Sequence, residues 1–359
     1  MSSQNNYIDA ILKIIRAISG NLSSIIEIAG EVAEKITAGG NIYTTDEKSG
    51  FAMEMTYRSG GMMLPLPLQN PDQVKKGDVL LASTLNINPK QQQEQFDAVR
   101  KKGGFIVLFG SNESPLTEYA DRLVDNTLPP GTVPVVEIKG KEKVCPAASV
   151  ANITAAWLLV GEVVAACTRL GKMPVMYASN DARGGVDWNG KYQDVAFHQP
   201  GEFNIPTLQK GCLSRAYLAD IKRCIKSIKY TQQELLEAAG QLGAETLKNN
   251  KKVYCSFNGH FLLQQLGLPG TPPVFTIIDP LTTPISKVNF ESGDIFVWVG
   301  YYYYPNHEIY FINIAKVKSV WINGARAINP ITLEPGKIII DPYWGYGDAS
   351  VAVPGYPIR

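Results

Sequence analysis

Apolar residues recur at three- and four-residue spacing over residues 7–20 and again over 23–36, which predicts two amphipathic helices. The pattern then changes to short apolar runs at 42–44, 78–82 and 105–109, each preceded by a turn residue such as glycine or asparagine. Runs of this kind are typical of strands buried on both faces of a parallel sheet. Because helical stretches separate them, the chain is predicted to form an α/β fold with helices covering both faces of the sheet.

The middle of the chain contains a long apolar helix followed by a stretch without periodicity. The helix is predicted over 148–170, and the stretch over 178–210 contains glycine, proline and asparagine throughout. A connection of that length indicates either a functional loop or a wrap around a neighbouring domain. Helical patterns return over 211–229 and 231–249. Five further strands are predicted near 252–256, 274–278, 294–299, 319–322 and 337–340.

Landmarks of the first half recur in the second half at a nearly constant spacing. Residues 77–81 are matched 216 residues later by residues 293–297. At a spacing of 211 residues, Ile42-Tyr43 is matched by Val253-Tyr254. The other pairs are Ala33-Glu34 with Ala244-Glu245, Pro89 with Pro305, Asp125 with Asp341, and Gly131 with Gly347. Such self-similarity indicates two copies of one α/β unit.

The repeat and the length of 359 residues predict two domains. The expected boundaries place the first domain at 1–177, a linker or wrap at 178–210, and the second domain at 211–359. No counterpart of the helix 148–170 follows in the second copy, so this copy is expected to be abbreviated.

Composition and charge narrow the possible functions. Hydrophobic residues make up 45% and charged residues 19% of the chain, as in ordinary globular proteins. A net charge of +1 gives no indication of nucleic-acid binding. The sequence has no apolar run of about 18 residues, so no membrane span is predicted. The N-terminal sequence lacks the basic and apolar regions of a secretory signal. We therefore expect a cytoplasmic protein.

Cysteine and histidine usage argues against a metal centre or a disulfide framework. The five cysteines are scattered without a C-x-x-C pair, and only three histidines are present. Two of these, His198 and His307, lie in polar stretches without evident partners. No metal and no cofactor are expected, and the thiols are expected to be reduced.

Two loops carry clustered small polar residues directly after predicted strands. They are residues 44–50 and residues 83–89. Ligands of open parallel sheets bind beyond the carboxyl ends of the strands, and hydroxyls beside helix N-termini can hold a phosphate. The alternative is that Ser49, Ser83 and Asn88 only cap the helices that follow.

Several stretches of the first half resemble the SIS (sugar isomerase) domain family. They are residues 42–57, Tyr57-Arg58-Ser59-Gly60-Gly61, Gly77 to Ser83, Tyr119-Ala120-Asp121 through Asp125-Asn126, and Pro146-Ala147-Ala148-Ser149. The resemblance covers roughly residues 5–190 and is closest to uncharacterised SIS proteins with a Glu-x-x-Tyr-Arg-x-Gly-Gly helix end, here residues 54–61. From about residue 230 onward the second copy resembles a remote SIS domain.

The resemblance implies a fold, a ligand and an assembly. SIS domains are flavodoxin-like three-layer α/β/α sandwiches around a five-stranded parallel sheet, so two are expected in tandem. Relatives such as phosphoheptose isomerase bind phosphosugars and hold the phosphate in the loop after the strand that residues 78–82 resemble. The chain is expected to form a homodimer or an intrachain pseudo-dimer. The substrate-binding residues implied by position are Ser49, Ser83, Thr84, Asn86, Asn88 and Ser149.

Both loops depart from the family pattern. The family's first loop reads Gly-x-Gly-[Ser/His]-Ser, whereas residues 44–48 lack glycine and include Asp46 and Glu47, which would place negative charge beside a phosphate. The second loop usually reads Ser-x-Ser-Gly-x-Thr, and residues 83–88 lack the glycine. In the second copy the corresponding loop contains four tyrosines, 301–304, which could stack on a sugar or pack in an interface. A carbohydrate without phosphate, or no ligand, is therefore an alternative.

Isomerisation of a phosphosugar requires a base that moves a proton between adjacent carbons, and Glu or His can serve. The candidates are Glu54, at the family's glutamate position, and His260, whose Gly259-His260 pair resembles the family's Gly-His. Alternatively, Glu54 pairs with Arg58 at i+4, and His260 is a structural turn residue. The hypothesis is a sugar- or phosphosugar-binding SIS protein and possible aldose–ketose isomerase. The alternative is a catalytically inactive sugar-binding, scaffold or regulatory protein with altered loops.

Overall fold

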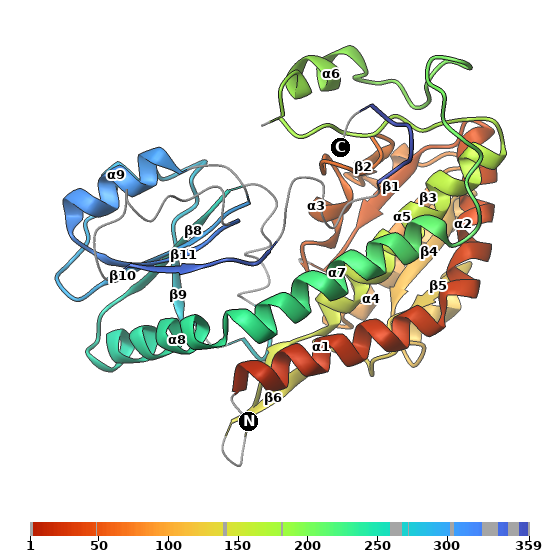
Figure 1. Cartoon of the computed structure of the whole chain (residues 1–359). Helices are drawn as coiled ribbons and strands as arrows, with labels where there is room; N and C mark the ends of the chain where they lie inside the picture. The colour runs from red at the N-terminus through yellow and green to blue at the C-terminus, as the bar shows by residue number, and fades with distance from the viewer. Residues whose placement is uncertain are drawn as a thin grey trace.

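The computed structural model describes residues 3–47, 49–138, 142–180, 182–258, 268–271, 273–301, 305–324, 337–343 and 352–357. Two five-stranded sheets, each covered by helices, form two units of the chain (Figure 1). Every described strand pair in these sheets is parallel. The predicted α/β class with two flavodoxin-like sandwiches is confirmed.

The first sheet has the strand order β2-β1-β3-β4-β5. Its strands are β1 (Ile42–Thr45), β2 (Pro65–Pro67), β3 (Val79–Ser83), β4 (Phe105–Gly110) and β5 (Arg122–Asp125). The helices of this unit are α1 (Ser3–Gly20), α2 (Leu22–Thr37), α3 (Phe51–Met55), α4 (Pro89–Lys101) and α5 (Ala148–Arg169). Alternate side chains of a strand point to opposite faces. Thus Val79 and Leu81 pack in the core with α1, α2 and α5, whereas Leu80 packs with α4.

The second sheet has the order β9-β8-β10-β11-β12, which is the order of the first sheet with equivalent strands. Its strands are β8 (Val253–Phe257), β9 (Phe275–Ile277), β10 (Ile295–Val299), β11 (Lys318–Ile322) and β12 (Ile338–Ile340). The helices α8 (Gln233–Lys248) and α9 (Asn306–Ala315) lie on opposite faces of this sheet (Figure 1). The buried aromatic residues Trp298 and Trp321 belong to the core on the α9 face.

The matched positions of the two halves form the same backbone turn before the central strand of each sheet. Asp78 precedes β3, Asp294 precedes β10, and both carboxylates are buried. Each accepts two backbone hydrogen bonds, from the N–H groups of Asn41 and Lys75 for Asp78, and of Lys252 and Glu291 for Asp294, at 2.8–2.9 Å. The acceptors are needed because buried N–H groups without partners cost free energy.

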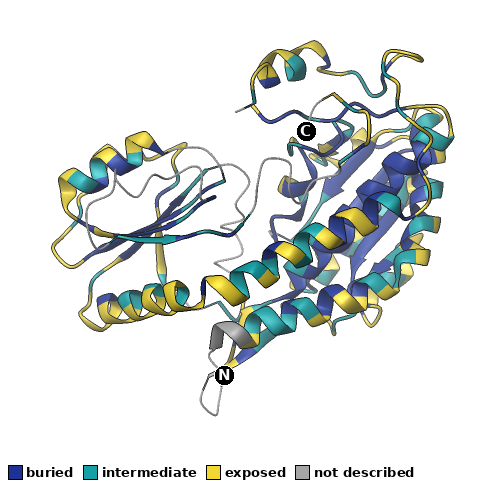
Figure 2. Cartoon of the chain, in the orientation of Figure 1, coloured by how far each residue is buried: buried dark blue, intermediate teal, exposed yellow. Residues whose placement is uncertain are grey.

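The long helix α5 forms the centre of the first unit. It packs against α2 on one side and against α7 (Cys212–Thr231) on the other. The strands of the first sheet and α5 are mostly buried (Figure 2). Among the described residues, α5 is the one helix with the length and composition to cross a membrane, but 89% of its apolar stretch is buried inside the protein. That burial is typical of a core helix.

Two segments differ from the simple alternating pattern. Strand β6 (Pro134–Ile138) pairs antiparallel with β7 (Glu142–Pro146), so these two strands form a separate hairpin and do not belong to the parallel sheet. The aperiodic connection contains a short helix, α6 (Gly185–Lys191). A Cβ atom at Gly185 would lie 1.9 Å from the carbonyl oxygen of Ser179, so the chain can fold back there only without a side chain. The domain limits at 177 and 210 stay predictions.

Candidate functional site

The two polar loops start side by side at the carboxyl edge of the first sheet. Strand β1 pairs in parallel with β3, and Thr45 lies opposite Ala82. The first loop leads into α3 and the second leads into α4. This is the edge at which open parallel sheets bind their ligands.

Three hydrogen-bond donors in the loop between β3 and α4 hold the carboxylate of Glu47. The Thr84 hydroxyl and the Leu85 N–H donate to Oε2, at 3.1 and 2.6 Å, and the Asn88 N–H donates to Oε1 at 2.5 Å. The Asn88 side chain makes no cap of its own, and Glu47, from another loop, accepts from the N–H of this residue, which directly precedes α4. Negative charge at this position also interacts favourably with the helix dipole. We call these four residues the Glu47 cradle.

The second unit contains a matching contact. Asn258 follows β8 at the position equivalent to Glu47, and Tyr301 follows β10 at the position equivalent to Leu85. The Tyr301 N–H donates to Oδ1 of Asn258 at 3.3 Å. In both units, therefore, a side-chain oxygen of the first loop accepts a hydrogen bond from the equivalent backbone N–H of the loop after the central strand.

Ser83 faces the interior and not the cradle. Its hydroxyl oxygen accepts a hydrogen bond from Nδ2 of Asn152 on α5 at 2.9 Å, and the same nitrogen also donates to the Thr84 carbonyl at 3.1 Å. Asn126 donates to Oδ1 of Asn152 at 2.7 Å. This buried network fixes the loop on α5. Asn152 was not predicted from the sequence, although a lone amide in an otherwise apolar helix was a usable signal.

The remaining predicted binding residues lie in separate local structures. Ser49 is buried and donates to Oδ2 of Asp46 (3.2 Å), which also accepts from the N–H of Ala52 in α3. Asn86 adopts a left-handed backbone conformation, and its Oδ1 accepts from the Ser114 hydroxyl at 2.7 Å. Ser149 lies buried in the first turn of α5, and its Oγ atom has no hydrogen-bond partner among the described residues.

Glu54 forms a nearly buried ion pair. Its Oε1 lies 3.0 Å from Nε of Arg58 and accepts a hydrogen bond from the indole N–H of Trp157 at 3.1 Å. The Arg58 guanidinium also lies over the Tyr301 ring, 5.1 Å from its centroid, which joins the first unit to the second. Burial lowers the pKa of Arg58, but Glu54, Tyr301 and Tyr217 together outweigh this and hold the pKa above its ordinary value. Burial, with a contribution from Glu54, raises the pKa of Tyr217.

The second predicted base, His260, and Tyr302–Tyr304 lie outside the described residues. Throughout the described ranges, no group of three or more His, Cys, Asp or Glu side chains could hold a metal ion. All five cysteines are described, and all are free thiols. Burial raises the pKa of Cys167 and Cys255 to about 12, so these two thiols are protonated at neutral pH.

No protein-family model and no curated protein matches the sequence. Solved structures of the same fold do match over nearly the whole chain. A proposed sugar binding protein from Salmonella typhimurium LT2 aligns with a TM-score of 0.58 at 9% identity, covering 94% of this chain and 92% of the other. The C-terminal domain of glucosamine-fructose-6-phosphate aminotransferase from Francisella tularensis aligns with a TM-score of 0.52 at 12% identity, covering 92% and 88%.

A proposed phosphosugar isomerase from Clostridium difficile 630 aligns with a TM-score of 0.50 at 11% identity, covering 96% of this chain and 88% of the other. At such low identities the matches establish the fold alone. The expected SIS-like fold is confirmed, and it spans both units of the chain.

Proposed function

We propose that this protein binds a carbohydrate derivative at the carboxyl edge of its first sheet, and that the bound sugar has no phosphate group in the loop after β3. Structures of the same fold are named for sugar binding and for phosphosugar isomerisation, which supports a sugar as the ligand. The Glu47 cradle is the observation that supports a sugar without phosphate in this loop, because the Glu47 carboxylate already accepts the hydrogen bonds that a phosphate would need.

The chemistry of the cradle disfavours a phosphate. Hydrogen bonds from amides to an ionised carboxylate are among the stronger ones in proteins, and a phosphate would first have to displace them. If Glu47 stayed nearby, the two anions would repel each other. A neutral or amine-bearing sugar avoids both costs.

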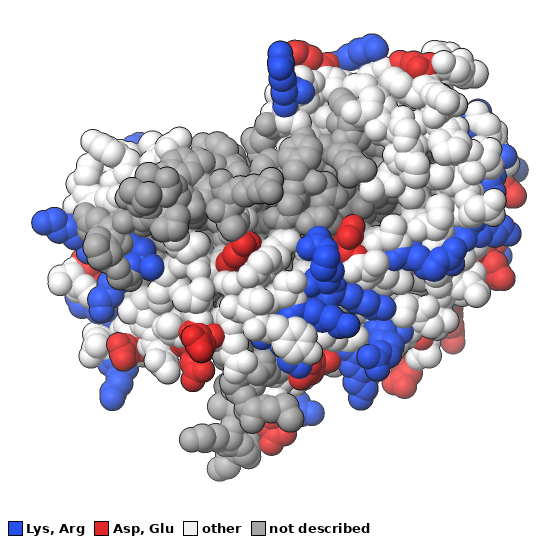
Figure 3. All heavy atoms as spheres, viewed as in Figure 1, with Lys and Arg blue, Asp and Glu red and all other residues white. Residues whose placement is uncertain are grey.

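A small ligand also fits the surface charge better than nucleic acid does. On the face viewed in Figure 3, acidic side chains are interspersed among the basic ones, and the net charge is only +1. A cytoplasmic location and assembly as a homodimer or intrachain pseudo-dimer stay part of this proposal.

Binding is favoured over isomerase catalysis by the geometry of Glu54. A catalytic base must accept a proton from the substrate, whereas the Glu54 carboxylate already accepts from Arg58 and Trp157. This is the arrangement of a structural ion pair. Both bonds end on Oε1, so the isomerase hypothesis would require Oε2 to act as the base beside the paired Arg58, or His260 to act.

We expect Glu47→Ala to create phosphate binding that the natural protein lacks. The substitution frees the Thr84 hydroxyl and the N–H groups of Leu85 and Asn88 for an external oxyanion. Inorganic phosphate, tested by isothermal titration calorimetry, should bind the variant with a Kd on the order of 1 mM, equivalent to about 4 kcal/mol. Glu94→Ala on the exposed side of α4 is the matched control and should not bind phosphate.

A thermal-shift screen of the natural protein tests the ligand class. Unphosphorylated hexoses, amino sugars and N-acetylamino sugars are compared with their 6-phosphates, and a sugar at 100 times its Kd should add about 2.7 kcal/mol of stability. Stabilisation by a 6-phosphate and not by its parent sugar would contradict the proposal. A response to no sugar of either kind would favour the scaffold alternative.

A further inference from the structure

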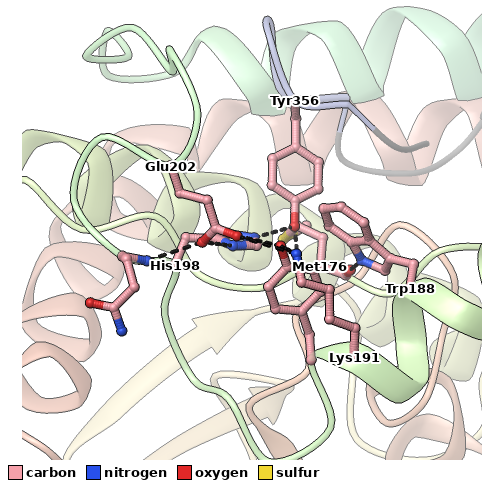
Figure 4. Close-up of polar contacts among 8 residues, drawn as sticks. Met176, Trp188, Lys191, His198, Glu202 and Tyr356 are labelled. Carbon is pink, nitrogen blue, oxygen red and sulfur yellow. Dashed lines mark hydrogen bonds and ion pairs between the residues drawn. The ribbon is translucent and has the colours of Figure 1, made fainter.

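Away from the candidate site, a chain of hydrogen bonds joins the C-terminal segment 352–357 to the connection between the two units (Figure 4). Nδ1 of His198 lies 3.0 Å from Oε2 of Glu202, and its Nε2 lies 2.7 Å from the hydroxyl oxygen of Tyr356. That hydroxyl also accepts a hydrogen bond from the backbone N–H of Met176 at 3.0 Å. We call these four residues the Tyr356 clasp. The expectation that His198 lacks partners is wrong, because one of them lies 158 residues away.

The partners determine where the protons of the clasp lie. Glu202 accepts hydrogen bonds from the Tyr192 hydroxyl and from the Gln199 N–H, and the bond from Tyr192 is the main cause that holds the pKa of Glu202 below its ordinary value. An ionised carboxylate only accepts, so Nδ1 of His198 carries a proton. A neutral ring then presents an unprotonated Nε2, and Tyr356 donates its hydroxyl proton to it.

The imidazole of His198 is enclosed by aromatic rings. Its side chain is only 2% exposed, and it lies in tilted or edge-on contact with its neighbours. The ring centroids within 4.7–5.8 Å are those of Trp188, Tyr192, Phe203 and Tyr356. Because these rings exclude water from the imidazole, they favour its neutral form over its charged form.

The titratable groups that face His198 are Glu202, Tyr192, Tyr356 and Lys191. Lys191 donates to the Tyr192 hydroxyl at 2.8 Å and lies 3.7 Å from Glu202. Burial holds the pKa of His198 below its ordinary value, and Lys191 acts in the same direction. The attraction of Glu202 opposes this shift without reversing it.

The clasp is connected to the backbone of residues 60–63, which follow Arg58. Met63 donates to the carbonyl of Val175 at 2.8 Å, and Tyr177 donates to the carbonyl of Gly61 at the same distance. Met176, held by Tyr356, lies between these two bonds. Residues 60–63 follow directly after the turn that carries Arg58, the partner of Glu54.

We propose that the Tyr356 clasp is a pH-sensitive device that fastens residues 352–357 to the connection at neutral pH and releases them in mild acid. When Nε2 of His198 takes up a proton, the ring N–H and the Tyr356 hydroxyl are both donors and point toward each other. Among the described residues, the hydrogen bonds of this hydroxyl are those to Met176 and His198. Its proton would therefore lose its acceptor.

The direction of the pH effect follows from proton linkage. In the fastened state the pKa of His198 is lowered, so the released state binds the proton more readily. The preference for the fastened state is therefore complete above the ordinary histidine pKa of about 6.5 and decreases as the pH falls below it. Between that value and the lowered pKa, the equilibrium constant for fastening should fall by up to about tenfold per pH unit.

Amide hydrogen exchange of the peptide that contains Met176 tests the device in the full-length protein. Corrected for intrinsic exchange, its protection should fall between pH 7.5 and pH 5.5, by at most about tenfold. His198→Gln cannot take up the proton, so its protection should not change with pH. His307→Gln, at an exposed histidine on α9, is the matched control and should keep the natural pH dependence.

A further variant separates the clasp from general acid sensitivity. Tyr356→Phe keeps the ring but removes the hydroxyl, so its Met176 amide should exchange fast at both pH values. Constant protection of the natural protein across this range would overturn the proposal, and so would a natural pH dependence retained by His198→Gln. If His198→Gln does not fold, Tyr356→Phe and His307→Gln decide the question by the same readout.

Discussion

Replacing Arg58 by leucine should lower the free energy of unfolding by about 3–5 kcal/mol, because it leaves the nearly buried carboxylate of Glu54 without its counter-charge. The side chains of Arg58 and Glu54 are only 19% and 10% exposed. Leucine also removes the cation–π contact with Tyr301 of the second unit. The loss is measured from urea unfolding followed by far-UV circular dichroism.

The double variant Glu54→Leu with Arg58→Leu distinguishes the two roles considered for Glu54. If the pair is structural, removing both charges should recover most of the stability lost by Arg58→Leu alone. The exposed pair Glu31–Arg122, at 2.9 Å, is the matched control, and Arg122→Leu should cost less than about 1 kcal/mol. An Arg58→Leu effect as small as this control would remove the physical case for a structural pair and return Glu54 to the candidate bases.

Glu162→Ala should be the second large destabilisation, by about 3 kcal/mol, because it leaves buried donors of another helix without an acceptor. Glu162 lies on α5 and is 0% exposed. Its Oε2 accepts from the Gly211 N–H at 2.7 Å, and its Oε1 accepts from the Ser214 hydroxyl at 2.7 Å and the Ser214 N–H at 3.3 Å. The carboxylate thus caps α7 in trans, where the helix dipole also favours negative charge. Thermal unfolding monitored by calorimetry measures the loss.

Two further substitutions bracket the effect at Glu162. Glu162→Gln keeps one acceptor oxygen but turns an amide NH2 group toward the remaining donors, so an intermediate loss is expected. Glu237→Ala, at an exposed position of α8, should change stability by less than about 0.5 kcal/mol. A Glu162→Ala variant as stable as Glu237→Ala would show that water satisfies the end of α7.

Most of the fold could be predicted from local patterns in the sequence. The short apolar runs at 42–44, 78–82 and 105–109 correspond to β1, β3 and β4, and the long helix at 148–170 corresponds to α5. Such patterns are readable because burial on a sheet or a helix imposes a fixed period on the apolar residues. The pairing of β6 with β7 was missed, because the apolar pattern of a short strand does not show which strand it pairs with or in which direction.

The sequence indicated which loops form the candidate site but not how their side chains are arranged. The sequence identified both loops and the unusual acidic residues Asp46 and Glu47. It could not show that Glu47 reaches the amides of the loop before α4, 41 residues away at Asn88, or that Ser83 turns toward Asn152, 69 residues away. Contacts of this kind depend on where neighbouring strands and helices place the loops.

The sequence by itself determined the α/β class, the two matched units and the edge of the sheet where polar loops gather, because these follow from periodicity and from covalent spacing. Only the tertiary structure decided which polar groups satisfy one another: Glu47 with the amides of the loop before α4, Glu54 with Arg58, and His198 with Tyr356. Those partners are chosen by packing between distant segments, since each buried donor or acceptor must find a partner wherever the fold happens to bring one within reach.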